Sequence, residues 1–124
     1  MLLGFSYQNK KNCSFKDVFN SNSWKADSLG CQNLRKDEIK VIAKYEKQEL
    51  IGMNKDTFLR YFGKPDYLVR ADSFEAYTYF LENTYLCDME YIDSTTMSGV
   101  LSNYANFGAI FIHDSLNRMM AIKP

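Results

Sequence analysis

The sequence contains 124 residues, 46% of them apolar and 15% aromatic, so it is long enough to form one domain with a core of ordinary size. Fifteen basic and fifteen acidic side chains cancel, which argues against non-specific binding to nucleic acid or to an anionic membrane surface. No stretch reaches the ~18 to 20 apolar residues that a bilayer-spanning helix needs. The short basic pairs at residues 10–11 and at Arg35 and Lys36 are expected to be solvated surface.

Residues 1–23 are rich in Asn, Ser and Lys and show no clear period, so we expect a partly flexible arm, followed by a single domain over residues 24–124. Phe15, Val18 and Phe19 could attach this arm to the core as one helical turn. The first five residues fit either the end of a secretion signal or the start of a cytosolic chain. Small residues are missing before Cys13, so lipidation at that cysteine is not expected.

A first helix is predicted over residues 31–47, after a turn-like cluster at residues 27–30. Its apolar residues Leu34, Val41, Ile42 and Tyr45 fall on one side, and most of its charged residues fall elsewhere. This pattern is typical of a surface helix with one packed face.

Three cysteines, Cys13, Cys31 and Cys87, lack any C-x-x-C pairing, and His113 is the one histidine that could join them in a metal site. We therefore expect neither a metal nor another cofactor. Two alternatives remain for the thiols. A disulfide between Cys13 and Cys31, with Cys87 as a buried apolar side chain, would indicate an oxidising compartment; three reduced thiols would not.

The strongest local signal lies in residues 51–66, which predict a short helix with a defined start and end. Asn54 can cap its start, and Asp56 lies in the first turn, where the helix dipole favours negative charge. Gly63 follows the helix at the position where a left-handed backbone conformation is favoured, and Pro65 prevents the helix from continuing. Its apolar face is formed by Phe58, Leu59 and Phe62.

Four strands are predicted after this helix, as two pairs at residues 67–70 with 74–81 and at residues 107–112 with 118–122. Residues 113–117 would connect the second pair as a hairpin turn. Both faces of the strand at residues 74–81 are partly apolar, so its pattern does not say which face meets the helices. The segment at residues 82–106 is longer than most loops, and we expect a recognition surface there or on the sheet.

Several of these residues together resemble the SmpA/BamE-like family of small bacterial envelope domains. The resemblance covers about residues 51–122, apart from the unmatched residues 82–106, and is carried by Gly52-Met53-Asn54, Phe58-Leu59, Phe62-Gly63-Lys64-Pro65-Asp66 and Tyr77-Thr78-Tyr79. It implies an α+β fold in which two helices pack on one face of an antiparallel sheet of about four strands. The β-lactamase inhibitory proteins look like relatives of that fold.

The resemblance also implies binding rather than catalysis. We expect a non-enzymatic protein-interaction or scaffold module, similar to the accessory lipoproteins of outer-membrane protein assembly, in the periplasm or at the outer-membrane periphery; a cytoplasmic location stays open. The alternative is an inhibitor or immunity-type protein that blocks an enzyme. A protein partner is expected, and membrane association only through an N-terminal signal or lipid anchor. The candidate interaction surface consists of Tyr77, Tyr79, Tyr85, Tyr91 and Tyr104.

Three enzymatic interpretations are less favoured than structural ones, and we assign no catalytic residue. Cys13 or Cys87 could form a thiol–imidazole pair with His113, but nothing in the sequence brings them together. The start of the helix at Asn54 offers free N–H groups to a phosphate, but Asp56 would repel it. Asp88 and Glu90, with Asp93 close by, could hold a cation or act as an acid–base pair, but an exposed sheet edge explains their charge more simply.

Overall fold

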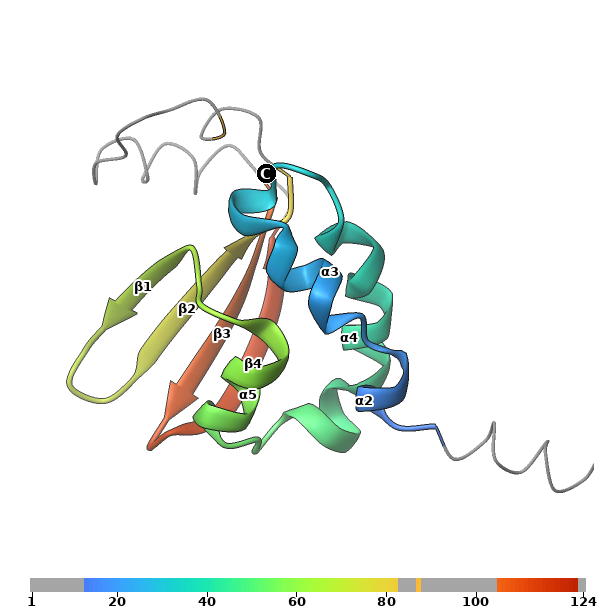
Figure 1. Cartoon of the computed structure of the whole chain (residues 1–124). Coiled ribbons are helices and arrows are strands. Elements are labelled where there is room, and N and C mark those ends of the chain that lie inside the picture. Colours follow the sequence, from blue (N-terminus) through green and yellow to red (C-terminus); the bar gives the residue numbers. More distant parts are fainter. Residues whose placement is uncertain (1–12, 83–86, 88–104, 123–124) are drawn as a thin grey trace, which may run out of the picture.

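The centre of the fold is a four-stranded antiparallel sheet in the order β1-β2-β3-β4 (Figure 1). The computed structural model describes residues 13–82, 87 and 105–122. The α+β class and an antiparallel sheet of about four strands are therefore confirmed. The strands are β1 (Tyr67–Arg70), β2 (Glu75–Phe80), β3 (Asn106–Ile112) and β4 (Ser115–Ile122).

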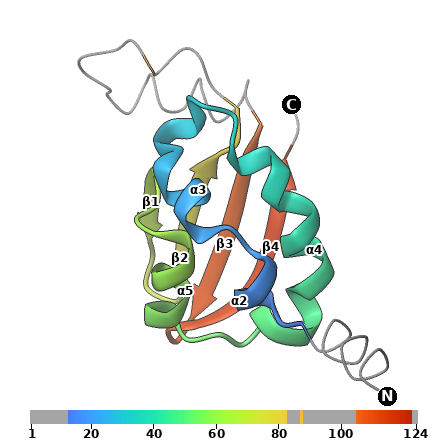
Figure 2. The same ribbon diagram turned by 45° about the vertical axis from the view of Figure 1, so that its right-hand side comes forward.

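The helices that precede the sheet in the chain lie over one of its faces (Figure 2). They are α2 (Phe15–Val18), α3 (Ser21–Ala26), α4 (Ile39–Tyr45) and α5 (Lys55–Phe62); a 3₁₀ turn (Arg35–Glu38) leads into α4 and a π turn (Glu46–Leu50) follows it. In the described part of the chain, no helix is long and apolar enough to span a membrane.

The helical run around α4 begins later than the predicted residue 31. The buried Asp27 carboxylate accepts backbone N–H groups of Gln32, Leu34 and Arg35 at 2.6 to 3.1 Å. It thereby holds residues 31–34 in a turn, in which Asn33 has a left-handed φ of 59°. We predicted the start of the helix too early because Asp27 lies before the helix and accepts these N–H groups across a turn.

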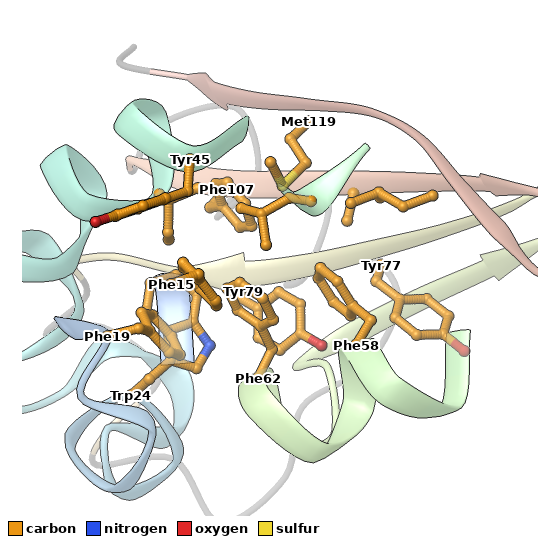
Figure 3. Close-up of a cluster of buried hydrophobic side chains, with 14 of the residues drawn as sticks. Phe15, Phe19, Trp24, Tyr45, Phe58, Phe62, Tyr77, Tyr79, Phe107 and Met119 are labelled. Atoms are coloured by element: carbon orange, nitrogen blue, oxygen red, sulfur yellow. The ribbon is translucent and has the colours of Figure 1, made fainter. Parts of the chain in front are cut away.

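The core between helices and sheet is predominantly aromatic (Figure 3). Phe62 of α5 lies 4.1 Å from Phe58 and 6.0 Å from Phe107 of β3, measured between ring centroids. Trp24 of α3 meets Phe107 edge-on at 5.5 Å. Such edge and offset contacts add to the free energy gained by burying these large rings.

The N-terminal arm contributes to this core. Phe15 and Phe19 are buried, as predicted for residues that attach the arm as one helical turn, and their rings stack at 4.6 Å. Val18 is 42% exposed, so its predicted part in the attachment is wrong: on a single turn it points away from the core. The division of the chain at residue 23 stays a prediction.

Helix α5 agrees with its prediction at both ends. The Asn54 side chain accepts the Asp56 N–H at 2.8 Å, and Gly63 ends the helix with a φ of 72°. The start of α5 is also fixed to β4, since Gly52 N–H donates to Leu116 O at 2.7 Å and Leu116 N–H donates to Met53 O at 2.8 Å. The first turn of α5 therefore lies beside the hairpin that joins β3 and β4.

That hairpin turn is shorter than predicted. His113 and Asp114 both have left-handed φ values, 53° and 61°, and Ile112 pairs directly with Ser115. This is the geometry of a two-residue turn whose twist matches that of the strands, and Asp adopts it more readily than most residues. The predicted turn over residues 113–117 is wrong because Leu116 belongs to β4 and is buried there.

The cysteine pairing differs from both alternatives left open by the sequence. Cys31 forms a disulfide with Cys87, with Cα atoms 5.8 Å apart, so the predicted disulfide between Cys13 and Cys31 is wrong. The helix that follows Cys13, α2, lies at the opposite end of the helical layer from the turn that precedes Cys31 (Figure 1). Cys87 is exposed rather than a buried apolar side chain.

Candidate functional site

The ion pair between Arg35 and Asp66 has the least exposed side chains of the ion pairs in the described part of the chain. The two side chains are 2% and 3% exposed, and Arg35 Nη1 donates to Asp66 Oδ2 at 2.6 Å. The expectation that Arg35 is solvated is wrong. The guanidinium also donates to the carbonyls of Trp24 and Phe80, and its central carbon lies over the Trp24 ring at 5.3 Å.

Both partners of this pair are satisfied by the protein itself. Asp66 additionally accepts the N–H groups of Leu29 and Phe80, at 3.0 and 2.8 Å. The pair thereby fixes the turn after α3 to the start of β1 and the end of β2. We interpret it as a structural cluster, because it offers no exposed group to a ligand.

A second charged cluster lies at the end of the sheet where the two hairpin turns meet α5. Lys55 contacts Glu75 at 2.8 Å and Asp114 at 3.1 Å, and Arg70 contacts Glu75 at 2.8 Å. Hydrogen bonds from Lys55 and Arg70 lower the pKa of Glu75 below its ordinary value, and the bond to Glu75 raises the pKa of Lys55. The cluster borders a pocket of about 490 Å³, whose two cations are already paired with carboxylates.

The sheet has two unlike faces. The inner face, toward the helices, carries buried side chains from three strands, among them Tyr77, Tyr79, Phe107, Phe111 and Leu116. The strand register assigns the alternating residues to the other side, which we call the outer face. The outer face includes Tyr67, Val69, Ala76, Thr78, Phe80, Asn106, Gly108, Ile110, Ile112, Ser115, Arg118 and Met120. Phe74, which precedes β2, lines a hollow together with Ile110 and Ile112 and so belongs to the same face.

The outer face is apolar and partly open. Val69, Phe74 and Ile112 are among the exposed large apolar residues, at 40%, 38% and 38% exposure. None of the described helices lies over this side (Figures 1 and 2). At the end of the outer face that is farther from the hairpin turns, Phe80 and Asn106 are buried. The exposed part of the outer face therefore lies near the hairpin turns.

A hollow of about 380 Å³ lies on the outer face near these turns. Its apolar walls are Phe74, Ile110 and Ile112, and its polar lining includes His113 and Arg118. Ser73, Phe74 and His113 also line the charged pocket around Lys55, so the two hollows adjoin.

The structure contradicts two of the five predicted surface tyrosines. Tyr77 is 4% exposed and Tyr79 is fully buried, with its hydroxyl donating to Gly63 O at 2.8 Å. Both point into the core, and burial raises the pKa of each hydroxyl. The remaining three, Tyr85, Tyr91 and Tyr104, lie outside the described residues.

The enzymatic alternatives gain no support from the described residues. Cys87 is bonded to Cys31 and so is not a thiol in this state, and His113 lies in the exposed turn between β3 and β4. No group of three side chains in the described part of the chain could hold a metal ion. The acidic residues Asp88, Glu90 and Asp93 lie outside the described ranges.

The residues of the outer face were not among the predicted site residues. The signal was present, since Val69, Ile110, Ile112 and Arg118 alternate with the residues that face the helices. This alternation shows which residues share a face of the sheet, but not which face points away from the helices. Because both sides of β2 are partly apolar, the sequence did not distinguish the inner from the outer face.

No family model, curated protein or solved structure matches the chain. The resemblance to SmpA/BamE-like domains therefore stays a prediction.

Proposed function

We propose that the chain is a non-enzymatic protein-binding module of the bacterial cell envelope and that it docks its partner on the outer face of the sheet. The observation that carries the proposal is the combination of an apolar outer face with helices that lie on the opposite side only. Contiguous exposed apolar surface on a small domain is a mark of an interaction site.

The composition of the outer face suits a protein interface. Tyr67, Phe74 and Met120 belong to residue types that are enriched where proteins associate, and Val69 and Ile112 add aliphatic surface. The strands that carry these residues are held by the sheet register and by the aromatic core beneath them. A preformed surface of this kind loses little conformational entropy when it binds.

Two observations support the envelope location. The disulfide between Cys31 and Cys87 is the kind of bond that persists in oxidising compartments such as the periplasm. The resemblance to SmpA/BamE-like domains implies the same compartment. Fold-level analogy does not transfer a partner, so the identity of the partner has to come from experiment.

The test is site-specific photocrosslinking in native cells. Val69 on the outer face is replaced by a photoreactive benzoylphenylalanine, and Lys40, exposed on α4, is replaced in the same way as the control. We expect a discrete cross-linked product from position 69 and none from position 40. No product at either position, or equal products at both, would argue against docking on the outer face.

The cross-linked partner would also separate the scaffold from the inhibitor. An enzyme whose activity falls when the purified chain is added would identify the chain as an inhibitor or immunity-type protein. A structural or assembly protein would favour the scaffold.

A further inference from the structure

The four strands place one charged side chain on the outer side of the sheet. It is Arg118 of β4, which lies opposite Ile110 of β3. Arg118 is exposed and has no carboxylate of the described residues within ion-pairing distance. It differs in this from Lys55 and Arg70, which form ion pairs with the carboxylates of Glu75 and Asp114.

Arg118 also borders the apolar hollow of the outer face. Phe74, Ile110 and Ile112 supply the apolar walls, while Arg118, His113 and Asn117 supply hydrogen-bond donors. Among the described residues, no carboxylate lines this hollow. A group that fills it well would therefore be apolar and would carry a negative charge beside the apolar part.

We infer that the partner presents an acidic segment to the outer face, with an aromatic or aliphatic side chain in the hollow and an adjacent Asp or Glu paired with Arg118. This inference rests on the proposed function and specifies the chemistry of its partner. A carboxylate suits Arg118 because the planar guanidinium can donate two parallel hydrogen bonds to it.

A protein segment fits this surface better than a small amphiphile such as a fatty acid. Phe74 and Ile112, which form the walls, are themselves more than a third exposed, so the hollow is shallow. Small apolar ligands favour pockets that enclose most of their surface. The apolar surface also continues from Ile110 across Ala76 of β2 to Val69 of β1, so it is a broad face that spans three strands and not one enclosed slot.

The first arm of the test compares three synthetic peptides that share a central Phe-Leu pair and differ in the flanking residues, which are Glu, Gln or Lys. Each is titrated into the isotopically labelled full chain and followed by NMR. We expect the Glu peptide to bind about fivefold more tightly than the Gln peptide, and the Lys peptide to bind most weakly. The shifted signals should include Ile110, Ile112 and Arg118, and the preference for Glu should weaken in high salt.

The second arm uses charge variants of the chain. Arg118→Gln should remove the preference for Glu over Gln, and Arg118→Glu should shift the preference to the Lys peptide. Arg60→Gln, which removes an exposed cation on α5, is the matched control and should leave the preference unchanged. The NMR spectrum of each variant shows directly whether it is folded.

Several results would overturn the inference: equal binding of the Glu and Gln peptides, a preference that survives in Arg118→Gln, or shifts confined to the helical layer. Tighter binding of laurate than of the Glu peptide would assign the hollow to a small amphiphile instead. Photocrosslinking from position 69 without any preference for Glu would leave the docking face in place and contradict only the acidic partner. An Arg118-dependent preference without photocrosslinking would contradict the proposed function.

Discussion

At the scale of single residues, the pair of Arg35 and Asp66 holds three segments together. Asp66 receives hydrogen bonds from Arg35, from the turn after α3 and from the last residue of β2. Replacing a buried ion pair with apolar residues is often harmless, but removing one partner leaves an uncompensated charge in the interior. The cost of a single substitution should therefore be large.

Asp66→Asn tests this directly. The amide cannot neutralise Arg35, and it has one acceptor oxygen where the carboxylate uses two, so we expect the free energy of unfolding to fall by about 3 to 5 kcal/mol. Urea denaturation monitored by circular dichroism gives this value. Glu82→Gln is the control, since its ion pair with Lys36 is about half exposed on both sides and should change stability by less than about 0.5 kcal/mol. Equal effects of the two substitutions would contradict the account.

The ion pairs of Glu75 predict a pH dependence. Because its pKa is lowered from the ordinary value of 4.5, the folded state binds this proton less readily than the unfolded state. The ion pairs therefore contribute stability above pH ~4.5, and this contribution is lost as the pH falls through the lowered pKa.

Glu75→Gln removes that contribution. The unmodified chain should be more stable than the variant at pH 7, and the difference should shrink below pH ~4.5, as measured by urea unfolding at a series of pH values. A difference that stays constant or grows on acidification would show that Glu75 is not stabilised as an anion.

Residue roles were predictable from sequence where their partners are local. Asn54 and Gly63 act within one turn of α5, and both have their predicted roles. Arg35 and Asp66 are 31 residues apart, and nothing in the sequence links them. In the sequence, Arg35 therefore resembled an ordinary surface cation, because only the folded structure places Asp66 beside it.

At the scale of elements, the distinction between local and tertiary contacts also explains which helix and strand boundaries were predicted wrongly. α5 and β1 begin and end close to their predicted residues because their signals lie in their own sequence. The start of the helical run before α4 depends on the buried Asp27, and the turn of the second hairpin depends on the burial of Leu116. These are tertiary contacts, which a local pattern does not contain.

The disulfide joins Cys31 and Cys87, which lie 56 residues apart in sequence. Cys31→Ser should lower the free energy of unfolding by about 2 to 4 kcal/mol, because a crosslink across a long loop restricts the unfolded chain. Thermal unfolding of the oxidised proteins measures the change. Cys13→Ser is the control, since it leaves this disulfide intact. A Cys31→Ser protein as stable as the control would contradict the assigned pairing.

At the scale of the whole molecule, the two faces of the sheet have different roles. The inner face and the helices form the aromatic core, and the outer face leaves Val69, Phe74 and Ile112 open. The resemblance implied helices on one face of the sheet, but the strand pattern did not say which face, since Glu75 and Tyr77 on one side of β2 alternate with Phe74 and Ala76 on the other. It also predicted that a recognition surface would lie on the sheet or in residues 82–106, without identifying the outer face.

Two neighbouring residues of β3 allow a direct test of the outer face. Phe111 is 1% exposed and points to the helices, whereas Ile112 is 38% exposed and points outward. Phe111→Asp should prevent folding, because it places an unpaired charge in the core. Ile112→Asp should fold with a nearly unchanged melting temperature, because its carboxylate is in contact with water.

The most direct measurement is the yield of photocrosslinked partner from position 69 in the Ile112→Asp protein. We predict that this folded variant loses most of the cross-linked product, because a charge in the wall of the apolar hollow opposes docking. A folded Ile112→Asp protein that cross-links as strongly as the unmodified chain would contradict the proposal that the outer face binds the partner.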